Sequence, residues 1–201
     1  MTPRTILSIA AALTVGLSTS ASAQKMVIQP ASRITVAGGS NVHDWACSGS
    51  KFDAAIELDA DPGNPISKVV VSIPTKSVKC GKDKMDENMY KALKADQFPT
   101  IRYELTSYTL DPSKTTATGF VALTKGELTV AGTTAKVEIP VTATRKDGGQ
   151  IVGEGTLRML MTDVGIKPPT ALLGTMRTKN EITVSFQVLL DKSVVVALTQ
   201  Q

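Results

Sequence analysis

Few residues of this chain have the types and spacing that metal binding requires. The sequence contains one histidine, His43, and two cysteines, Cys47 and Cys80. Zinc and copper sites normally recruit several His or Cys ligands, and only His43, Asp44 and Cys47 lie close together in the sequence. We therefore predict no metal site and no cofactor.

A catalytic role for His43 would require a serine or cysteine nucleophile beside it. The chain has no Gly-x-Ser-x-Gly motif, no phosphate-binding glycine loop and no nucleotide fingerprint. No spacing singles out a carboxylate pair for acid–base chemistry. We interpret His43 as a polar residue at a strand or turn, and we predict no catalytic residues and no enzymatic activity.

The first 23 residues have the layout of a cleavable secretory signal. Arg4 supplies a basic start, Ile6 to Leu17 form an apolar run of 12 residues, and Ala21-Ser22-Ala23 precede Gln24 as a small-residue cleavage site. The apolar run is shorter than the roughly 20 residues that cross a bilayer, and Gln24 is not the cysteine that a lipoprotein anchor requires. We predict export to the periplasm, with full secretion as the alternative.

The two cysteines suit an oxidising compartment, where an even pair most simply forms a disulfide. A bond between Cys47 and Cys80 would enclose 34 residues, and the chain-entropy model gives about 4 kcal/mol of stabilisation. The alternative is a reactive thiol or a metal ligand.

Removing residues 1–23 leaves 178 residues, which suits a single domain, and lowers the formal charge from +4 to +3. Nucleic-acid binders more often cluster Lys and Arg among aromatic residues, whereas the eight aromatic residues here are scattered from Trp45 to Phe186. We predict one domain over residues 24–201, with about the last ten residues as a loose tail, and no binding to nucleic acid. No later apolar stretch is long enough to cross a membrane, so we expect a soluble mature chain without a transmembrane segment.

Apolar and polar residues alternate along most of the mature chain, and a period of two is typical of strands. The clearest alternations cover Phe52–Asp59, Val69–Ile73, Ile101–Thr106, Val137–Thr142 and Ile182–Val188, with further candidates at Ile34–Ala37, Thr116–Leu123, Glu127–Ala131 and Gly155–Met161. Turns are predicted at Asp61–Pro65, Lys125-Gly126, Gly132-Thr133 and Asp147–Gly149. The pattern predicts an all-β fold whose antiparallel sheet closes on itself or packs on another. Pro140 has no backbone N–H to donate to the hydrogen bonds between strands, so we expect a sheet edge or a bulge there.

Two segments depart from the strand pattern. Between Asp83 and Ala95, apolar residues at helical spacing predict an amphipathic helix that Asp83 or Asp86 would cap. This helix is either a lid over one end of a barrel or a connector that buries a satellite core. The segment Asp163–Asn180 has no clear period and exceeds the usual loop length of about 4–6 residues. Its apolar residues Leu172, Leu173 and Met176 either line the mouth of a cavity or pack on the outside of the sheet.

A closed sheet of around eight strands can hold one small ligand. Small residues at strand positions would leave room inside it, namely Ala54, Gly119, Ala131 and Ala143. Bulky residues near strand centres are our candidates for the lining: Trp45, Phe52, Tyr103, Phe120, Leu157 and Phe186. For each of these, ordinary core packing is the alternative.

Four motifs follow one another in an order that resembles a known family. They are Asn41-Val42-His43-Asp44-Trp45, Met89–Leu93 leading to Phe98–Tyr103, Gly126–Thr134 preceding Val137–Val141, and Met161–Ile166. In this order and spacing they resemble the YceI-like family of exported polyisoprenoid-binding proteins, over about Ile28 to Leu189. The resemblance implies a lipocalin-like antiparallel β-barrel of about eight strands, with one short amphipathic helix and an elongated apolar cavity. It also implies a long isoprenoid ligand, either quinone-like or prenyl-phosphate-like.

We therefore expect a periplasmic carrier that binds an isoprenoid or other long-chain lipid by desolvating it inside the barrel. Each methylene group buried in this way contributes about 0.8 kcal/mol. The alternatives are an envelope stress or protein-interaction module with a filled barrel, and an envelope enzyme that acts on a lipid or small molecule. A dimer is one option for the oligomeric state.

Overall fold

The computed structural model describes residues 24–26, 28–58, 66–116, 118–147, 150–171 and 174–190. Several expectations lie outside this part of the chain: the signal peptide, the turn at 61–65, the glycines 148 and 149, the loop residues 172 and 173, and the C-terminal tail. Among the described residues, no helix has the length and apolar character needed to span a bilayer.

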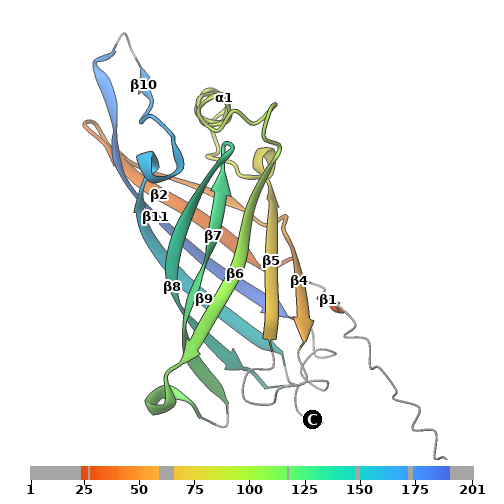
Figure 1. Cartoon of the computed structure of the whole chain (residues 1–201). Helices are drawn as coiled ribbons and strands as arrows, with labels where there is room; N and C mark the ends of the chain where they lie inside the picture. Colours follow the sequence, from red (N-terminus) through yellow and green to blue (C-terminus); the bar gives the residue numbers. More distant parts are fainter. Residues whose placement is uncertain are drawn as a thin grey trace, which may run out of the picture.

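Antiparallel strands make up most of the structure (Figure 1). They are β1 (Gln24–Met26), β2 (Arg33–Ser40), β3 (Asp44–Gly49), β4 (Asp53–Leu58), β5 (Ile66–Pro74), β6 (Thr100–Leu110), β7 (Gly119–Val130), β8 (Thr133–Arg145), β9 (Ile151–Leu160), β10 (Thr170–Ala171) and β11 (Met176–Leu190). One α-helix, α1 (Asp83–Ala92), and three short 3₁₀ turns, η1 (Thr75–Ser77), η2 (Pro112–Lys114) and η3 (Met161–Val164), connect them. The strand order is β1-β4-β5-β6-β7-β8-β9-β11-β2-β3, and β10 pairs with β11. The predicted all-β class with one short helix is confirmed.

Each edge of this curled sheet is tied to another part of the molecule. Ile28, just after β1, bridges Leu190 at the end of β11. On the other edge, Ser48 of β3 exchanges two backbone hydrogen bonds with Lys79, at 2.7 and 2.8 Å. The Cys47–Cys80 disulfide lies beside this bridge, so the predicted pairing of the two cysteines is confirmed.

The predicted strand segments all fall within or overlap observed strands, but one predicted turn is wrong. Lys125 and Gly126 lie in the middle of β7, so the two segments on either side form a single strand. The register with β6 slips there, because Leu105 pairs with Gly126 and Ser107 with Lys125, leaving Thr106 as an extra residue. The glycine marks a bulge with a close approach of another chain segment, which a sequence pattern does not distinguish from a turn.

The turn predicted at Gly132-Thr133 and the edge predicted at Pro140 agree with the structure. Ala131 and Gly132 join β7 to β8 with φ angles of 50° and 81°, as a two-residue hairpin turn with both central residues left-handed requires. Pairs between β8 and β9 run only from Val141 to Arg145 on the β8 side. Pro140 therefore begins a stretch of β8 that is bonded to β7 but not to β9, which is the expected local edge.

Helix α1 lies over one end of the barrel (Figure 1), so the lid interpretation is the better one. The helix ends at Ala92, earlier than expected, because Lys94 adopts a left-handed φ of 48°. The predicted caps are wrong: Lys82 is the N-cap residue and makes no side-chain cap hydrogen bond. Asp86 instead accepts a hydrogen bond from the backbone N–H of Cys80, at 2.6 Å.

The segment expected to be a loop up to Asn180 is shorter in the structure, because β11 already begins at Met176. Asn41 explains this difference, since it holds the start of β11 against the β2–β3 hairpin. Its side-chain oxygen accepts from the N–H of Arg177 and its amide donates to the carbonyl of Thr175, both at 2.8 Å. These bonds are long-range, and they have no counterpart in local hydrophobic periodicity.

Candidate functional site: an apolar cavity inside the barrel

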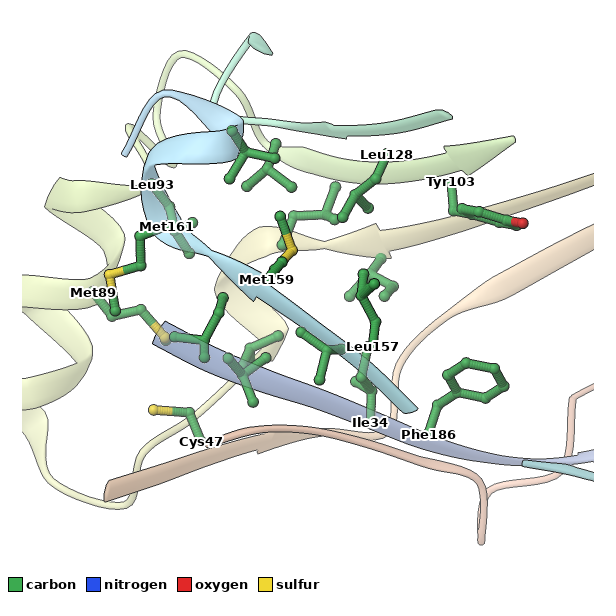
Figure 2. A pocket seen from close by; sticks show the side chains of 18 of the residues that line it. Ile34, Cys47, Met89, Leu93, Tyr103, Leu128, Leu157, Met159, Met161 and Phe186 are labelled. Atoms are coloured by element: carbon green, nitrogen blue, oxygen red, sulfur yellow. The ribbon is translucent and has the colours of Figure 1, made fainter. Parts of the chain in front are cut away.

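The barrel encloses a cavity of about 770 Å³, lined by side chains from β2 to β9, from β11 and from α1 (Figure 2). This volume lies within the range of about 300–1,000 Å³ that is usual for ligand sites. The barrel is long as well as hollow, because a strand such as β7, with 12 residues, spans about 40 Å at 3.4 Å per residue. An elongated molecule is therefore the shape that this space fits.

All six candidate lining residues lie around this cavity: Trp45, Phe52, Tyr103, Phe120, Leu157 and Phe186. Their contact with a ligand stays a prediction. Met176 of the expected mouth loop also lines it. Of the small residues expected to leave room, Ala54 does so. Gly119, Ala131 and Ala143 are not among the residues that line it. Ala131 is buried in the core next to Val164, and a Cβ on Gly119 would meet the carbonyl of Ala143 rather than open space.

Three of the lining aromatic rings pack closely against glycines of neighbouring strands. A Cβ built on Gly126 would lie 2.6 Å from the ring of Tyr103, and one on Gly155 would lie 2.5 Å from the ring of Phe186. The indole of Trp45 covers Gly38 in the same way and donates its Nε1–H to the carbonyl of Gly39 at 3.2 Å. Because no Cβ intervenes, each ring rests on the wall, and less of the ring projects into the lumen.

Methionines line the end of the cavity below α1, and the sequence analysis assigned only Met176 among them to the site. They are Met85 and Met89 of α1, Met159 of β9, Met161 of η3 and Met176 of β11. In Figure 2, Met89, Met159 and Met161 approach the lumen near the helix. The helical spacing of Met85 and Met89 was the available signal, since it identified the apolar face of the lid. Thioether side chains adapt to irregular shapes, so the end of the cavity below α1 can accommodate ligands of different shapes.

Several polar residues line the cavity at the end of the barrel where α1 and β10 lie (Figure 1). They include Lys82, Lys84 and Asn88 of the α1 region, which are exposed, and Thr170 and Thr178 of β10 and β11. We call this set of residues, together with Ser40 and His43, the mouth. Within the described residues, Lys82 and Lys84 are the charged side chains of the lining.

His43 lies exposed at the tip of the β2–β3 hairpin, where its backbone bonds to Ser40 at 2.8 to 3.0 Å. No group of three or more His, Cys, Asp or Glu side chains gathers in the part of the chain that the structure describes. The disulfide also removes the thiolate of Cys47 from the candidate set His43, Asp44 and Cys47.

One polar group is buried in the apolar wall. Burial raises the pKa of the Tyr103 hydroxyl, because the charged phenolate would lose its hydration, and the nearby Thr124 hydroxyl offsets this only in part. Thr124 itself donates to the carbonyl of Ile139 at 2.8 Å. Tyr103 is therefore neutral at physiological pH, and its hydroxyl can both donate and accept.

The model of the YceI-like domain matches residues 27–190 of this chain. The chain belongs to the YceI-like family. The resemblance drawn from the four sequence motifs is thereby confirmed. No curated protein sequence matches the chain at a significant level.

Solved structures share the fold of this YceI-like protein at low sequence identity. BcnA of Burkholderia cenocepacia is 16% identical, with a TM-score of 0.65 over 81% of this chain and 99% of that one. A polyisoprenoid-binding domain of Saccharophagus degradans, implicated in plant cell wall breakdown, is 13% identical, with a TM-score of 0.62 over 83% and 97%. The YceI protein of Campylobacter jejuni is 17% identical, with a TM-score of 0.55 over 73% and 84%. These likenesses confirm the lipocalin-like barrel fold.

Proposed function

We propose that this YceI-like protein is a carrier that binds one long isoprenoid lipid inside its barrel. The observation that carries the proposal is the apolar cavity of about 770 Å³, whose charged lining residues, Lys82 and Lys84, are exposed at the mouth. A long isoprenoid has an apolar chain that loses its contact with water in such a space, at about 0.8 kcal/mol for each buried methylene. The description of the Saccharophagus degradans domain as polyisoprenoid-binding supports the same ligand class.

The mouth beside α1 is the route by which we propose the lipid enters. The segment before the helix is tethered to β3 by the disulfide at Cys80. The Tyr90 hydroxyl also donates to the carbonyls of Lys76 and Val78, at 3.0 and 2.8 Å. These contacts hold the lid beside the mouth, and we propose that the lid moves against them to admit the lipid.

We propose the periplasm as the place of action, from the signal-like residues 1–23 and from the disulfide, which suits an oxidising compartment. Binding rather than catalysis is favoured because the lining supplies apolar surface, and because its charged side chains, Lys82 and Lys84, lie exposed at the mouth rather than around a buried reacting group.

Native mass spectrometry of the mature protein from its own periplasm tests the carrier. The expected result is a stoichiometric adduct with the mass of an isoprenoid, which solvent extraction then identifies. A bare protein mass that stays unchanged after isoprenoid quinones are added would contradict the carrier and support an interaction module.

A further inference from the structure

The buried hydroxyl of Tyr103 has no partner in the apolar wall. Within the described residues, its oxygen is shielded from solvent and makes no hydrogen bond, and the Thr124 hydroxyl lies near it but outside hydrogen-bonding geometry. A polar group buried without a partner is costly, so it requires an explanation. Figure 2 shows the hydroxyl on the side of the cavity away from Met89 and Leu93, and so away from the lid.

Strand β7 holds the Tyr103 ring in place, and so fixes the position of its hydroxyl. The Tyr103 ring rests on Gly126, where a Cβ would lie 2.6 Å from it. Thr124 lies two residues before Gly126 on β7, and Tyr108 of β6 is the cross-strand partner of Thr124; both line the cavity. We call Tyr103, Thr124 and Tyr108 the hydroxyl spot.

The charge of the lining limits what this spot can bind. Its charged side chains, Lys82 and Lys84, are exposed at the mouth. A phosphate beside Tyr103 would be buried without a counter-ion, which is strongly unfavourable. A carbonyl or hydroxyl oxygen carries no net charge and can accept the tyrosine proton.

We propose that the hydroxyl spot binds a neutral oxygen atom of the lipid, so that the protein takes oxygenated isoprenoids such as quinones and alcohols with their polar group inside the barrel. This inference rests on the proposed carrier function. It specifies that the polar group of the ligand is a neutral oxygen. Quinone-like ligands meet this requirement, whereas the charged group of a prenyl phosphate would have to lie at the mouth.

The test compares three lipids with related C20 chains on the delipidated mature protein: phytol, the hydrocarbon phytane, and phytyl phosphate. Their affinities are measured by displacement of 1-N-phenylnaphthylamine. The substitution Tyr103→Phe removes the hydroxyl and keeps the ring. We expect it to weaken phytol binding about five- to tenfold, the loss of one buried hydrogen bond. The affinities for phytane and phytyl phosphate should change by less than about twofold.

Tyr90→Phe is the matched control, because the Tyr90 hydroxyl is already bonded to two carbonyls outside the cavity lining. It should lower the melting temperature, and any effect on affinity that it has through the lid should be equal for the three lipids. A second measurement needs no variant: the infrared carbonyl stretch of menaquinone-4 bound to the wild type should lie below its value in hexane, as hydrogen bonding to the carbonyl requires.

The outcomes separate the two proposals. If none of the lipids binds, the carrier function is wrong and the hydroxyl spot falls with it. If the lipids bind but Tyr103→Phe affects phytol and phytane equally, the carrier function stands and the hydroxyl spot is overturned. A carbonyl stretch equal to that in hexane also overturns it.

Discussion

Pairs of one glycine and one aromatic residue shape the inside of this barrel. Tyr103 with Gly126, Phe186 with Gly155 and Trp45 with Gly38 each place a ring on a strand that has no Cβ beneath it. The aromatic members were predicted as lining from their positions in the alternation. Their glycine partners were not predicted, because each pair joins residues on different strands.

Gly126→Ala tests these pairs at the position where a Cβ would press on a backbone oxygen as well as on the ring. The new Cβ would lie 2.5 Å from the carbonyl oxygen of Glu104 and 2.6 Å from the Tyr103 ring. We expect a loss of about 1–3 kcal/mol in the free energy of unfolding, as for other overpacked sites, and weaker isoprenoid binding because the ring moves into the lumen. Urea unfolding and lipid titration measure the two effects.

Gly153→Ala is the control for this variant, since the nearest atom to its Cβ would be the carbonyl oxygen of Val188 at 3.9 Å. Its stability should stay equal or rise by up to about 1 kcal/mol, because alanine loses less backbone entropy than glycine. Equal stability of both alanine variants would show that the Tyr103–Gly126 contact has no structural role.

Helix α1 and the strands below it depend on the link between β3 and the segment that leads into the helix. The disulfide, the Ser48–Lys79 bridge and the bond from the Cys80 N–H to Asp86 all lie there. Cys47 is almost fully buried, at 2% exposure, and packs against Ile73 and Val78. This link therefore joins the lid to the edge of the barrel.

Replacing both cysteines with alanine tests the link. We expect a loss of about 4 kcal/mol in the free energy of unfolding, the chain-entropy value for a loop of this length, together with faster lipid release as the lid loosens. Urea unfolding and the rate of lipid transfer to vesicles measure these effects. Reductant should lower the stability of the wild type and leave that of the double variant unchanged. If reductant lowered the stability of both proteins equally, the disulfide would not be the source of the stabilisation.

The barrel as a whole is stabilised by whatever fills its cavity, because a ligand that binds only the folded state shifts unfolding by mass action. The three clusters of buried residues lie around the lumen, at η3, at the disulfide and between β8 and β9. A bound lipid would connect them through the space that the protein leaves unfilled.

An isoprenoid quinone at about 100 times its Kd should therefore stabilise the delipidated protein by about 2.7 kcal/mol, which raises the Tm by roughly 5–10 °C for a chain of this size. Calorimetry measures this shift. Ala54→Leu adds bulk to a residue of the lining and should reduce the shift. If lipid did not change the Tm of the wild type, the proposal that the lipid binds inside the barrel would be wrong.

Local patterns in the sequence determined the strands, the helix and the family. The alternation from Ile34 to Val188 specifies which face of each strand is apolar, and the spacing of Met85 and Met89 specifies the face of the lid. The candidate lining residues follow from the same alternation, because a closed sheet has one inner face.

Only the tertiary structure decided how the inner face is used. It showed that Lys125-Gly126 lies within a strand opposite a bulge of β6, that Asn41 holds the start of β11, and that Asp86 bonds Cys80 rather than capping its own helix. It also placed one unpartnered hydroxyl in an apolar wall. These features join residues far apart in the chain or depend on the distance between individual side-chain atoms, and hydrophobic periodicity contains neither kind of information.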